Sequence, residues 1–425
     1  MGIKVAVIGG GSTYTPELIE GLANRRERLP IDELVLHDID AQRREIVGGL
    51  ASRMLARMEW GGRLVLTDDA RVAIDGADFV LFQLRVGGQA ARLLDETLPL
   101  RFGTIGQETT GAGGLAKALR TVPVVLELAE LATKHAAPGA WIVDFTNPVG
   151  IVTQALIDRG HRAIGLCNVA ITLQRAMAAR LGLEPNDLQL EHVGLNHLSW
   201  ITAARENGTD RLPELLATYG ESIAGDLGLP VGLIRNLHAV PSYYLRYYYA
   251  FDEVMAEQLN GHSRAEEVMD LERRLLDMYA DPTRDTKPEL LADRGGAFYS
   301  EAAAQLLASL HDGAGDVQVV DVRNDGAIAE LDPDDVVEVP SRIDRDGAHP
   351  TPQPPMPPDM RDLVLAVKHF ERLAIRAALS GERADVRAAL EAHPLVGGRI
   401  GDVEPLLDAL LDMNRAYLPQ FGAAR

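Results

Sequence analysis

The chain has 425 residues, of which 46% are hydrophobic, enough for a large core divided among two or three domains. Its formal net charge of −20 argues against a nucleic-acid partner, because phosphate backbones are bound by clustered lysines and arginines. The single cysteine, Cys167, excludes an internal disulfide and favours a reducing compartment. The first eleven residues lack the features of a signal peptide, and no apolar run is long enough to cross a membrane. We therefore expect a cytoplasmic protein that binds neither membranes nor nucleic acid.

The first part of the chain alternates short apolar runs with helical patterns. Residues 3–8 predict a strand that leads into three glycines, and a helical pattern follows at 16–23. The later strands are expected at 33–38, 63–67, 79–84 and 141–145, with a second helix at 41–58. Strands that alternate with helices predict an α/β fold with a parallel sheet. We assign residues 1–165 to this N-terminal domain.

The second part of the chain mixes helices with fewer strands. Strands are expected at 317–322 and 336–339, and helical patterns lie at 171–181, 263–278, 299–310, 360–380 and 403–413. Residues 349–358 are rich in proline, which is excluded from helix interiors, so we expect an extended segment before the last helices. We assign residues 166–425 to a C-terminal mixed α+β domain.

The glycines after the first strand have the composition of a nucleotide-binding turn. Glycine permits a close backbone approach to a pyrophosphate, and the N-terminus of the following helix favours its negative charge. Asp38 ends the second strand, where a carboxylate can accept a hydrogen bond from a ribose hydroxyl, which favours NAD over NADP. Tyr14 replaces the third glycine of the usual GxGxxG pattern, so a purely structural glycine turn is the alternative. The sequence predicts a Rossmann domain whose cofactor contacts are Gly9, Gly11, Ser12, Thr13 and Asp38.

One cysteine and one histidine are candidate metal ligands. Cys167 comes shortly after the strand-like pair at 163–164, and His197 ends the sequence Gly-Leu-Asn-His. A thiolate and an imidazole suit a transition metal and leave coordination positions open for substrate oxygens. The alternative is a small buried cysteine and a hydrogen-bonded core histidine, which is the more common situation for these residue types.

Two segments, 84–96 and 106–114, are dense in glycine and polar residues. Neither composition suits a packed helix or a central strand, so we expect loops at strand ends, where α/β proteins form their sites. Ordinary turns are the alternative. Asn147 precedes Pro148, which holds it extended, so that its side chain can point into a cleft.

Residues 241–249 contain five of the ten tyrosines in the chain. Such clusters usually pack half-buried or form a subunit interface. The functional alternative is that one tyrosine is a general base, with its pKa lowered by a metal or another cation.

The segments with unusual composition occur in a distinctive order. They are VIGGGSTYTP, LRVGGQAARLLDE, GTIGQETTGAGG, DFTNPVG, LCNV, VGLNHLSW, PSYYLRYYY, HSRAEE, RGGAFYSEAA and VVEVPS. Together they resemble glycoside hydrolase family 4, in particular its 6-phospho-β-glucosidases, and the resemblance covers nearly the whole chain. It implies a fold similar to lactate and malate dehydrogenases, with NAD and a divalent metal, usually manganese, as cofactors.

The resemblance also implies roles for particular residues. Cys167 and His197 correspond to metal ligands, and Tyr244 corresponds to the catalytic base, with Tyr243 as the adjacent alternative. Glu108 corresponds to the residue that raises the basicity of this base. The residues expected to contact the substrate are Arg92, Asn147 and Arg264.

Asn168 takes a position where family members that cleave α-glucosides tend to carry an aspartate as proton donor. An amide is not a carboxylic acid, so this departure is typical of the β-glucoside branch and leaves the donor to the leaving group open. We include Asn168 among the catalytic-site residues.

The implied reaction is hydrolysis of a 6-phospho-β-glucoside to glucose 6-phosphate and an aglycone. It proceeds by NAD-dependent oxidation at C3, deprotonation at C2 and elimination, and NAD is regenerated in each turnover. The substrate would be a phosphorylated disaccharide or an aryl β-glucoside, and the protein a homodimer or homotetramer. The alternatives are a family 4 glycosidase for α-glucosides, galactosides or glucuronides, and a plain NAD-dependent dehydrogenase.

Overall fold

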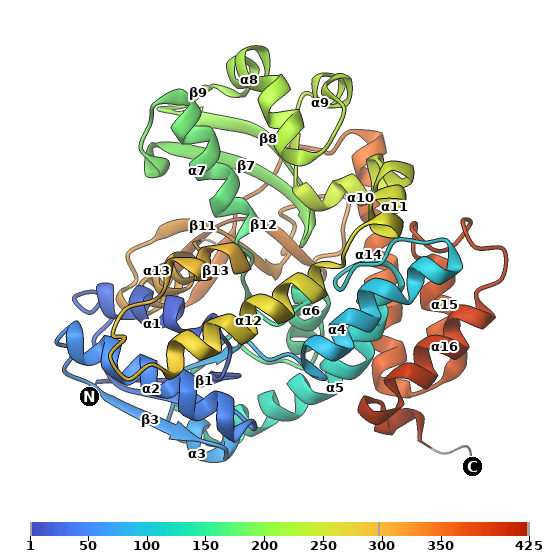
Figure 1. Cartoon of the computed structure of the whole chain (residues 1–425). Helices are drawn as coiled ribbons and strands as arrows, with labels where there is room; N and C mark the ends of the chain where they lie inside the picture. Colours follow the sequence, from blue (N-terminus) through green and yellow to red (C-terminus); the bar gives the residue numbers. More distant parts are fainter. Residues whose placement is uncertain (1, 296–297, 423–425) are drawn as a thin grey trace.

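The structure is a computed structural model that describes residues 2–295 and 298–422 (Figure 1). Gly296 and Ala297, which belong to the RGGAFYSEAA segment, lie outside the described residues. In the first part of the chain, strands and helices alternate as the sequence predicts. The strands are β1 (Ile3–Ile8), β2 (Ile31–His37), β3 (Arg63–Thr67), β4 (Phe79–Phe82), β5 (Trp141–Asp144) and β6 (Ala163–Gly165). The helices between them are α1 (Thr15–Asn24), α2 (Ala41–Arg57), α3 (Ala70–Ile74), α4 (Gly88–Thr97), α5 (Gly111–His135) and α6 (Val149–Asp158).

These strands form the parallel part of one large sheet, in the order β3-β2-β1-β4-β5-β6. This is the strand order of the doubly wound Rossmann fold, and it confirms the predicted α/β class. Beyond β6 the sheet continues with three antiparallel strands, namely β11 (Asp316–Arg323), β12 (Val336–Asp344) and β13 (Gly347–Pro350). The assigned boundary at residue 165 coincides with the end of β6, although the sheet continues across it. The division into two domains stays a prediction.

Alternation along β1 explains why helices cover both faces of the large sheet. Val5 and Val7 pack into one core with α1, α2 and α13 (Tyr299–Asp312), whereas Ala6 and Ile8 pack into a second core. That second core contains α3, α5, α6 and the C-terminal helices α14 (Pro358–Ser380), α15 (Arg383–Ala392) and α16 (Glu404–Asn414). A parallel strand buried on both faces requires apolar residues at successive positions, and the sequence of β1 provides them.

A second, antiparallel sheet lies at the top of Figure 1. It consists of β7 (Leu188–Leu195), β8 (Leu198–Glu206), β9 (Thr209–Asp210) and β10 (Val240–Pro241). A separate apolar core joins it to α7 (Val169–Leu181), α8 (Leu212–Leu227) and α9 (Val231–Leu237). The chain continues through α10 (Arg246–Tyr249) and α11 (Phe251–Asn260) to α12 (Arg264–Ala280). This last helix crosses the front of the Rossmann part and packs on α2 and α4 (Figure 1).

The two glycine-rich segments are loops only in their first parts, so the prediction that they are loops is partly right. Only residues 84–87 and 106–110 are irregular, since α4 begins at Gly88 and α5 at Gly111. A Cβ atom on Gly113 would lie 2.3 Å from the carbonyl oxygens of Asp95 and Gln107. The glycines therefore serve close packing at the start of a helix, a use that composition does not separate from a loop.

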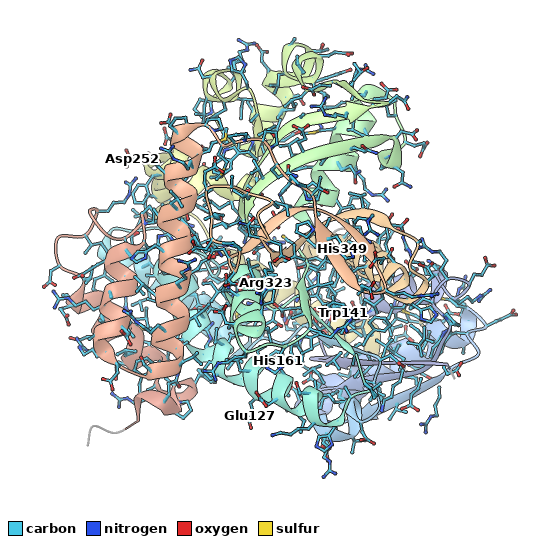
Figure 2. All side chains as sticks on the ribbon, turned by 180° about the vertical axis from the view of Figure 1, so that it is seen from behind. Glu127, Trp141, His161, Asp252, Arg323 and His349 are labelled. Carbon is cyan, nitrogen blue, oxygen red and sulfur yellow. The ribbon has the colours of Figure 1, made fainter. Side chains whose placement is uncertain are left out.

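The proline-rich segment is extended, as predicted. Residues 351–357 form neither helix nor strand, and α14 begins at Pro358. The hairpin of β12 and β13 lies on the side of the molecule seen in Figure 2, where a Cβ atom on Gly347 would come within 2.6 Å of the ring of Trp141. Within the described ranges, no helix combines the length and the apolar character needed to cross a membrane.

Candidate active site

A cavity of about 1440 Å³ opens at the carboxyl ends of β1, β2 and β4. In doubly wound sheets, ligands bind at this edge, where the strand order reverses between β1 and β4. The volume exceeds that of a typical small-molecule pocket, so a dinucleotide and a second ligand both have room. The walls include the glycine turn after β1, the start of α4 and the tyrosine segment 243–247.

Close packing fixes the glycine turn at one end of the cavity. Gly9 has a φ of +91°, and a Cβ atom there would lie 2.8 Å from the carbonyl oxygen of Gln83. A Cβ atom on Gly10 would lie 2.8 Å from the Cβ of Leu36. The amides of Gly9 and Gly10 both donate to the carbonyl oxygen of His37. The turn therefore needs glycine, as predicted, and it leads the chain to the N-terminus of α1, where a pyrophosphate would bind.

Some of the predicted cofactor residues face the cavity, and the others lie behind the glycine turn. Asp38 lines the cavity, and its Oδ2 accepts a hydrogen bond of 2.8 Å from the amide of Gly11. Ser12 lines the same wall. Thr13 is fully buried, and its hydroxyl donates to Oε1 of Glu272 on α12 across 3.3 Å. The structure thus brings Gly9, Ser12 and Asp38 to the cavity, whereas Gly11 and Thr13 support the turn from behind.

Glu272 on α12 links the residues behind the glycine turn to neighbouring elements by hydrogen bonds. Its carboxylate accepts hydrogen bonds from Arg43 at 3.1 Å, Arg294 at 2.9 Å and Gln89 at 3.0 Å. Burial raises the pKa of this carboxyl, but the guanidinium groups of Arg294 and Arg43 outweigh burial and lower it below its usual value. An ionised carboxylate therefore joins α2, α4 and α12 directly behind the nucleotide turn.

Glu108 lies at the centre of a buried charge cluster in the cavity wall. It is 6% exposed, accepts a hydrogen bond of 2.6 Å from Nζ of Lys117, and pairs with Arg85 and Arg92. Burial opposes its ionisation, but the three cations outweigh burial and hold the pKa of Glu108 well below its usual range. Burial and the charge of Arg85 lower the pKa of Lys117 to about 7. Arg92 also pairs with Glu96 at 2.7 Å, which fixes its guanidinium on α4.

His197 lies in the turn between β7 and β8, where its backbone φ is +62°. Its Nδ1 is 2.9 Å from the hydroxyl of Thr109, and this contact leaves Nε2 as the nitrogen for a metal ion. Burial lowers the pKa of His197 to about 4, so the imidazole is neutral and able to coordinate a metal.

Cys167 follows β6 and is buried beside the same turn. The side chain of Asn196, the residue before His197, hydrogen-bonds to its thiol. Burial raises the pKa of the thiol well above its usual value, so a divalent cation is the group that would hold it as a thiolate. In the described part of the chain, no cluster of three or more His, Cys, Asp and Glu side chains is arranged for a metal. A metal held by these two ligands would thus have positions open for substrate oxygens.

Tyr244 stacks on the imidazole of His197, with ring centres 3.6 Å apart and planes inclined by 10°. Burial raises the pKa of Tyr244 well above its usual value, and the charge of Arg92 acts in the opposite direction. Tyr243 is 42% exposed instead, and its hydroxyl accepts a hydrogen bond from Arg246. The geometry therefore favours Tyr244 over Tyr243 as a base beside the candidate metal ligands.

The expected substrate contacts Arg92, Asn147 and Arg264 line the same cavity. Asn168, which was expected among the catalytic residues, lines it as well. Oδ1 of Asn147 is buried and has no hydrogen-bond partner among the described residues, so it is available to a ligand. Asn168 precedes the first residue of α7. Arg264 begins α12, where it pairs with Glu267 at 2.8 Å and remains 44% exposed.

Comparison with known proteins agrees with this geometry over the whole chain. The model of the family 4 glycosyl hydrolases matches residues 4–183, and the model of their C-terminal domain matches residues 192–396. The chain belongs to glycosyl hydrolase family 4. A probable 6-phospho-beta-glucosidase of Bacillus subtilis is 38% identical over 436 residues, which cover 99% of this chain and 98% of that protein.

Solved structures of family 4 proteins have the same fold. The 6-phospho-beta glucosidase of Thermotoga maritima, solved with NAD and glucose-6-phosphate, has a TM-score of 0.93 and 35% sequence identity. The match covers 98% of this chain and 99% of that one, and another structure of the same protein contains manganese, NAD+ and glucose-6-phosphate. Malate dehydrogenase from Plasmodium falciparum matches 88% of this chain and 98% of its own at a TM-score of 0.54 and 14% identity. This last likeness concerns the fold alone and confirms the predicted dehydrogenase-like architecture.

Sequence reasoning missed several residues of this family 4 site. They are Arg85 and Lys117 beside Glu108, Thr109 beside His197, and Glu272 behind the nucleotide turn. Lys117 alone carried a usable signal, because it interrupts an apolar stretch of α5. Arg85, Thr109 and Glu272 gave no such signal, because only the fold brings each of them to its partner.

Proposed function

We propose that this family 4 chain hydrolyses 6-phospho-β-glucosides to glucose 6-phosphate and the aglycone, with NAD and Mn²⁺ as cofactors. The observation that carries the proposal is that Tyr244, which lines the same cavity as the nucleotide turn, stacks on His197 beside Cys167. The relatives support the substrate class, because the Bacillus subtilis protein is named for this activity. The Thermotoga maritima structures support the cofactors and the phosphorylated sugar.

The residues described above fit both cofactors. The glycine turn, Ser12 and Asp38 would hold NAD, because Gly9, Ser12 and Asp38 line the cavity and a Cβ atom on Gly11 would lie 2.7 Å from Oδ2 of Asp38. Cys167 and His197 would hold the metal, as one soft and one borderline donor. When bound, NAD supplies a hydride acceptor for C3 of the sugar, and the metal supplies a Lewis acid for the sugar oxygens.

The side chains of the chain itself perform the remaining work. A carbonyl at C3 acidifies the proton at C2, and Tyr244 would remove that proton as a general base. The stack of Tyr244 on His197 supports this role, because it keeps the tyrosine beside the proposed metal. The aglycone then leaves C1 by elimination, water adds at C1, and reversal of the C3 oxidation completes a net hydrolysis. The negative charge of Glu108 favours proton uptake by Tyr244.

Binding groups position the sugar for this chemistry. Oδ1 of Asn147 accepts a hydrogen bond from a sugar hydroxyl, and Arg92 and Arg264 bind its oxygens or its phosphate. Asn168 orients the substrate by its amide, which does not donate a proton as a carboxylic acid would.

The decisive experiment is release of p-nitrophenol from p-nitrophenyl β-glucoside 6-phosphate, with NAD and Mn²⁺ added together, singly or not at all. We expect release only with both cofactors, without accumulation of NADH. The α-anomer and the unphosphorylated β-glucoside are the matched controls for linkage and phosphate. Net NADH formation would show a dehydrogenase, faster cleavage of the α-anomer would change the specificity, and release without NAD would refute the mechanism.

We also propose that the chain forms a homodimer or homotetramer in the cytoplasm, and that residues 1–165 and 166–425 are its domains. The single cysteine supports a reducing compartment. Leu259 on α11 is 61% exposed and Met269 on α12 is 42% exposed, and a subunit contact would shield such apolar side chains from solvent. Sedimentation equilibrium measures the assembly, and a monomer at micromolar concentration would contradict it.

A further inference from the structure

Tyr243 is a half-exposed ring in the cavity wall, next to the proposed base. Its ring centre lies 6.0 Å from that of Tyr244, in an edge-on arrangement. Tyr247 also contacts Tyr244, with ring centres 6.2 Å apart, and it lines the same cavity. The three rings form a continuous aromatic wall, and Tyr243 is its exposed part at 42%.

Arg246 fixes the orientation of this exposed ring. Its Nη1 donates a hydrogen bond of 2.9 Å to the hydroxyl of Tyr243, and its Cζ lies 5.4 Å from the ring centre. The same guanidinium pairs with Glu257 on α11, and the side chain of Arg246 is only 15% exposed. An aromatic side chain held in this way loses little conformational entropy when a ligand packs against it.

The chemistry of the site determines where the leaving group lies. Tyr244 removes the proton at C2, and the aglycone is bonded through oxygen to C1, the adjacent carbon. The aglycone therefore lies beside Tyr244 and its neighbours. Of the three rings that contact Tyr244 in the described part of the chain, His197 is assigned to the metal and Tyr247 is the less exposed tyrosine. Tyr243 is the ring with an open face.

We propose that Tyr243 is the platform on which the aglycone stacks, and that the ligand class it selects is a planar aryl group. This inference rests on the proposed function, because Tyr244 sets the place of C2. Offset and edge-on aromatic contacts are individually modest, so the selection of aryl over alkyl aglycones should be about two- to tenfold. Arg246 acts through Tyr243 as its positioning residue.

The test compares kcat/KM for phenyl and methyl β-glucoside 6-phosphate in the NAD- and Mn²⁺-loaded enzyme. Tyr243→Leu keeps much of the volume but removes the ring, and it should reduce the phenyl-to-methyl ratio about two- to tenfold, mainly through KM for the phenyl substrate. Tyr243→Phe keeps the ring and should retain most of the wild-type ratio. Tyr417→Leu is the matched control, because Tyr417 is 38% exposed in the same cavity but lies against Gly87.

Three results would overturn the proposal that the aglycone stacks on Tyr243. The first is a wild-type ratio in Tyr243→Leu, and the second is an equal reduction in Tyr417→Leu. The third is a Tyr243→Phe variant as impaired as Tyr243→Leu, because the hydrogen bond to Arg246 would then matter instead of the ring. Failure of the proposed function is distinguishable, since the wild-type enzyme would then hydrolyse neither substrate.

Discussion

Breaking the buried ion pair between Asp95 on α4 and Arg120 on α5 is expected to destabilise the protein strongly. Both side chains are fully shielded from solvent, and the two groups meet in a bidentate arrangement. Arg120 also donates to the carbonyl oxygen of Val86 at 3.0 Å and to the side chain of Asn414 at 3.2 Å. The pair therefore joins α4, α5, the loop after β4 and α16.

Asp95→Asn keeps the shape of the side chain but leaves the charge of Arg120 without compensation. Removing one partner of a buried pair costs about 3–5 kcal/mol. Unfolding entropies near 2.1 cal/mol/K per residue give about 0.9 kcal/mol/K for a chain of 425 residues. The melting temperature should therefore fall by about 3–6 °C.

Thermal unfolding followed by circular dichroism measures this shift. It should be recorded at pH 8, because burial raises the pKa of Asp95 to about 6 and the carboxylate must be ionised. The matched control is Glu391→Gln, which breaks a pair with Arg387 whose two side chains are each 53% exposed. Exposed pairs contribute less than about 1 kcal/mol, so the control should melt within about 1 °C of the wild type. Equal melting temperatures for the two variants would refute the reasoning.

Three further predictions concern the site and the pH dependence of folding. Tyr244→Phe should lower kcat by about 10²- to 10⁴-fold, while calorimetric titration shows unchanged NAD binding. Cys167→Ala should abolish Mn²⁺ binding in electron paramagnetic resonance titrations, and wild-type affinity would contradict its assignment as a ligand. Burial lowers the pKa of His393 from 6.5 to about 3, so between these values the unfolded chain takes up a proton that the folded chain excludes. Folding stability should fall as pH drops through this window, by up to about 1.4 kcal/mol per pH unit from this group. Denaturant titrations at several pH values measure this dependence. The free energy of unfolding should change less with pH in His393→Asn than in the wild type.

Hydrophobic patterning was sufficient to predict the parallel sheet. Runs of apolar residues mark every parallel strand except the short β6, which only a strand-like pair suggested. The strand predicted at 79–84 ends at Phe82. The next residue, Gln83, lies outside the strand and its side chain holds the glycine turn. Its Nε2 donates to the carbonyl oxygen of Gly9 at 3.1 Å and to the hydroxyl of Thr15 at 2.8 Å. The local sequence pattern thus predicts the strand, but it does not predict the residue at which the strand ends.

The helical parts of the glycine-rich segments were taken for loops because the need for glycine comes from backbone that is distant in the sequence. A Cβ atom on Gly113, in the first turn of α5, would lie 2.3 Å from the carbonyl oxygen of Asp95. The local amino-acid composition does not indicate which backbone segment packs against the glycine. Glycine for close approach and glycine for a loop therefore have the same sequence signature.

The proposed metal ligands Cys167 and His197 come from the resemblance to family 4, and their spacing in the sequence alone could not have suggested them. His197 lies in a hairpin of the small sheet, whereas Cys167 follows a strand of the large one. The two sheets meet through Glu338 on β12, which accepts hydrogen bonds from Asn196 at 3.1 Å and His192 at 2.8 Å. These partners are more than a hundred residues apart in the sequence, so only the assembled fold brings the two proposed ligands together.

One part of the site could have been derived physically from the sequence. Lys117 lies among alanine, glycine and leucine near the start of α5 and is 1% exposed. A buried ammonium without a partner costs several kcal/mol, so a lysine in an apolar helix implies an acid supplied from elsewhere. Glu108 is that acid, at 2.6 Å from Nζ. Because Glu108 also pairs with Arg85 and Arg92, the acid that Lys117 requires is the residue that holds these cations in the cavity wall.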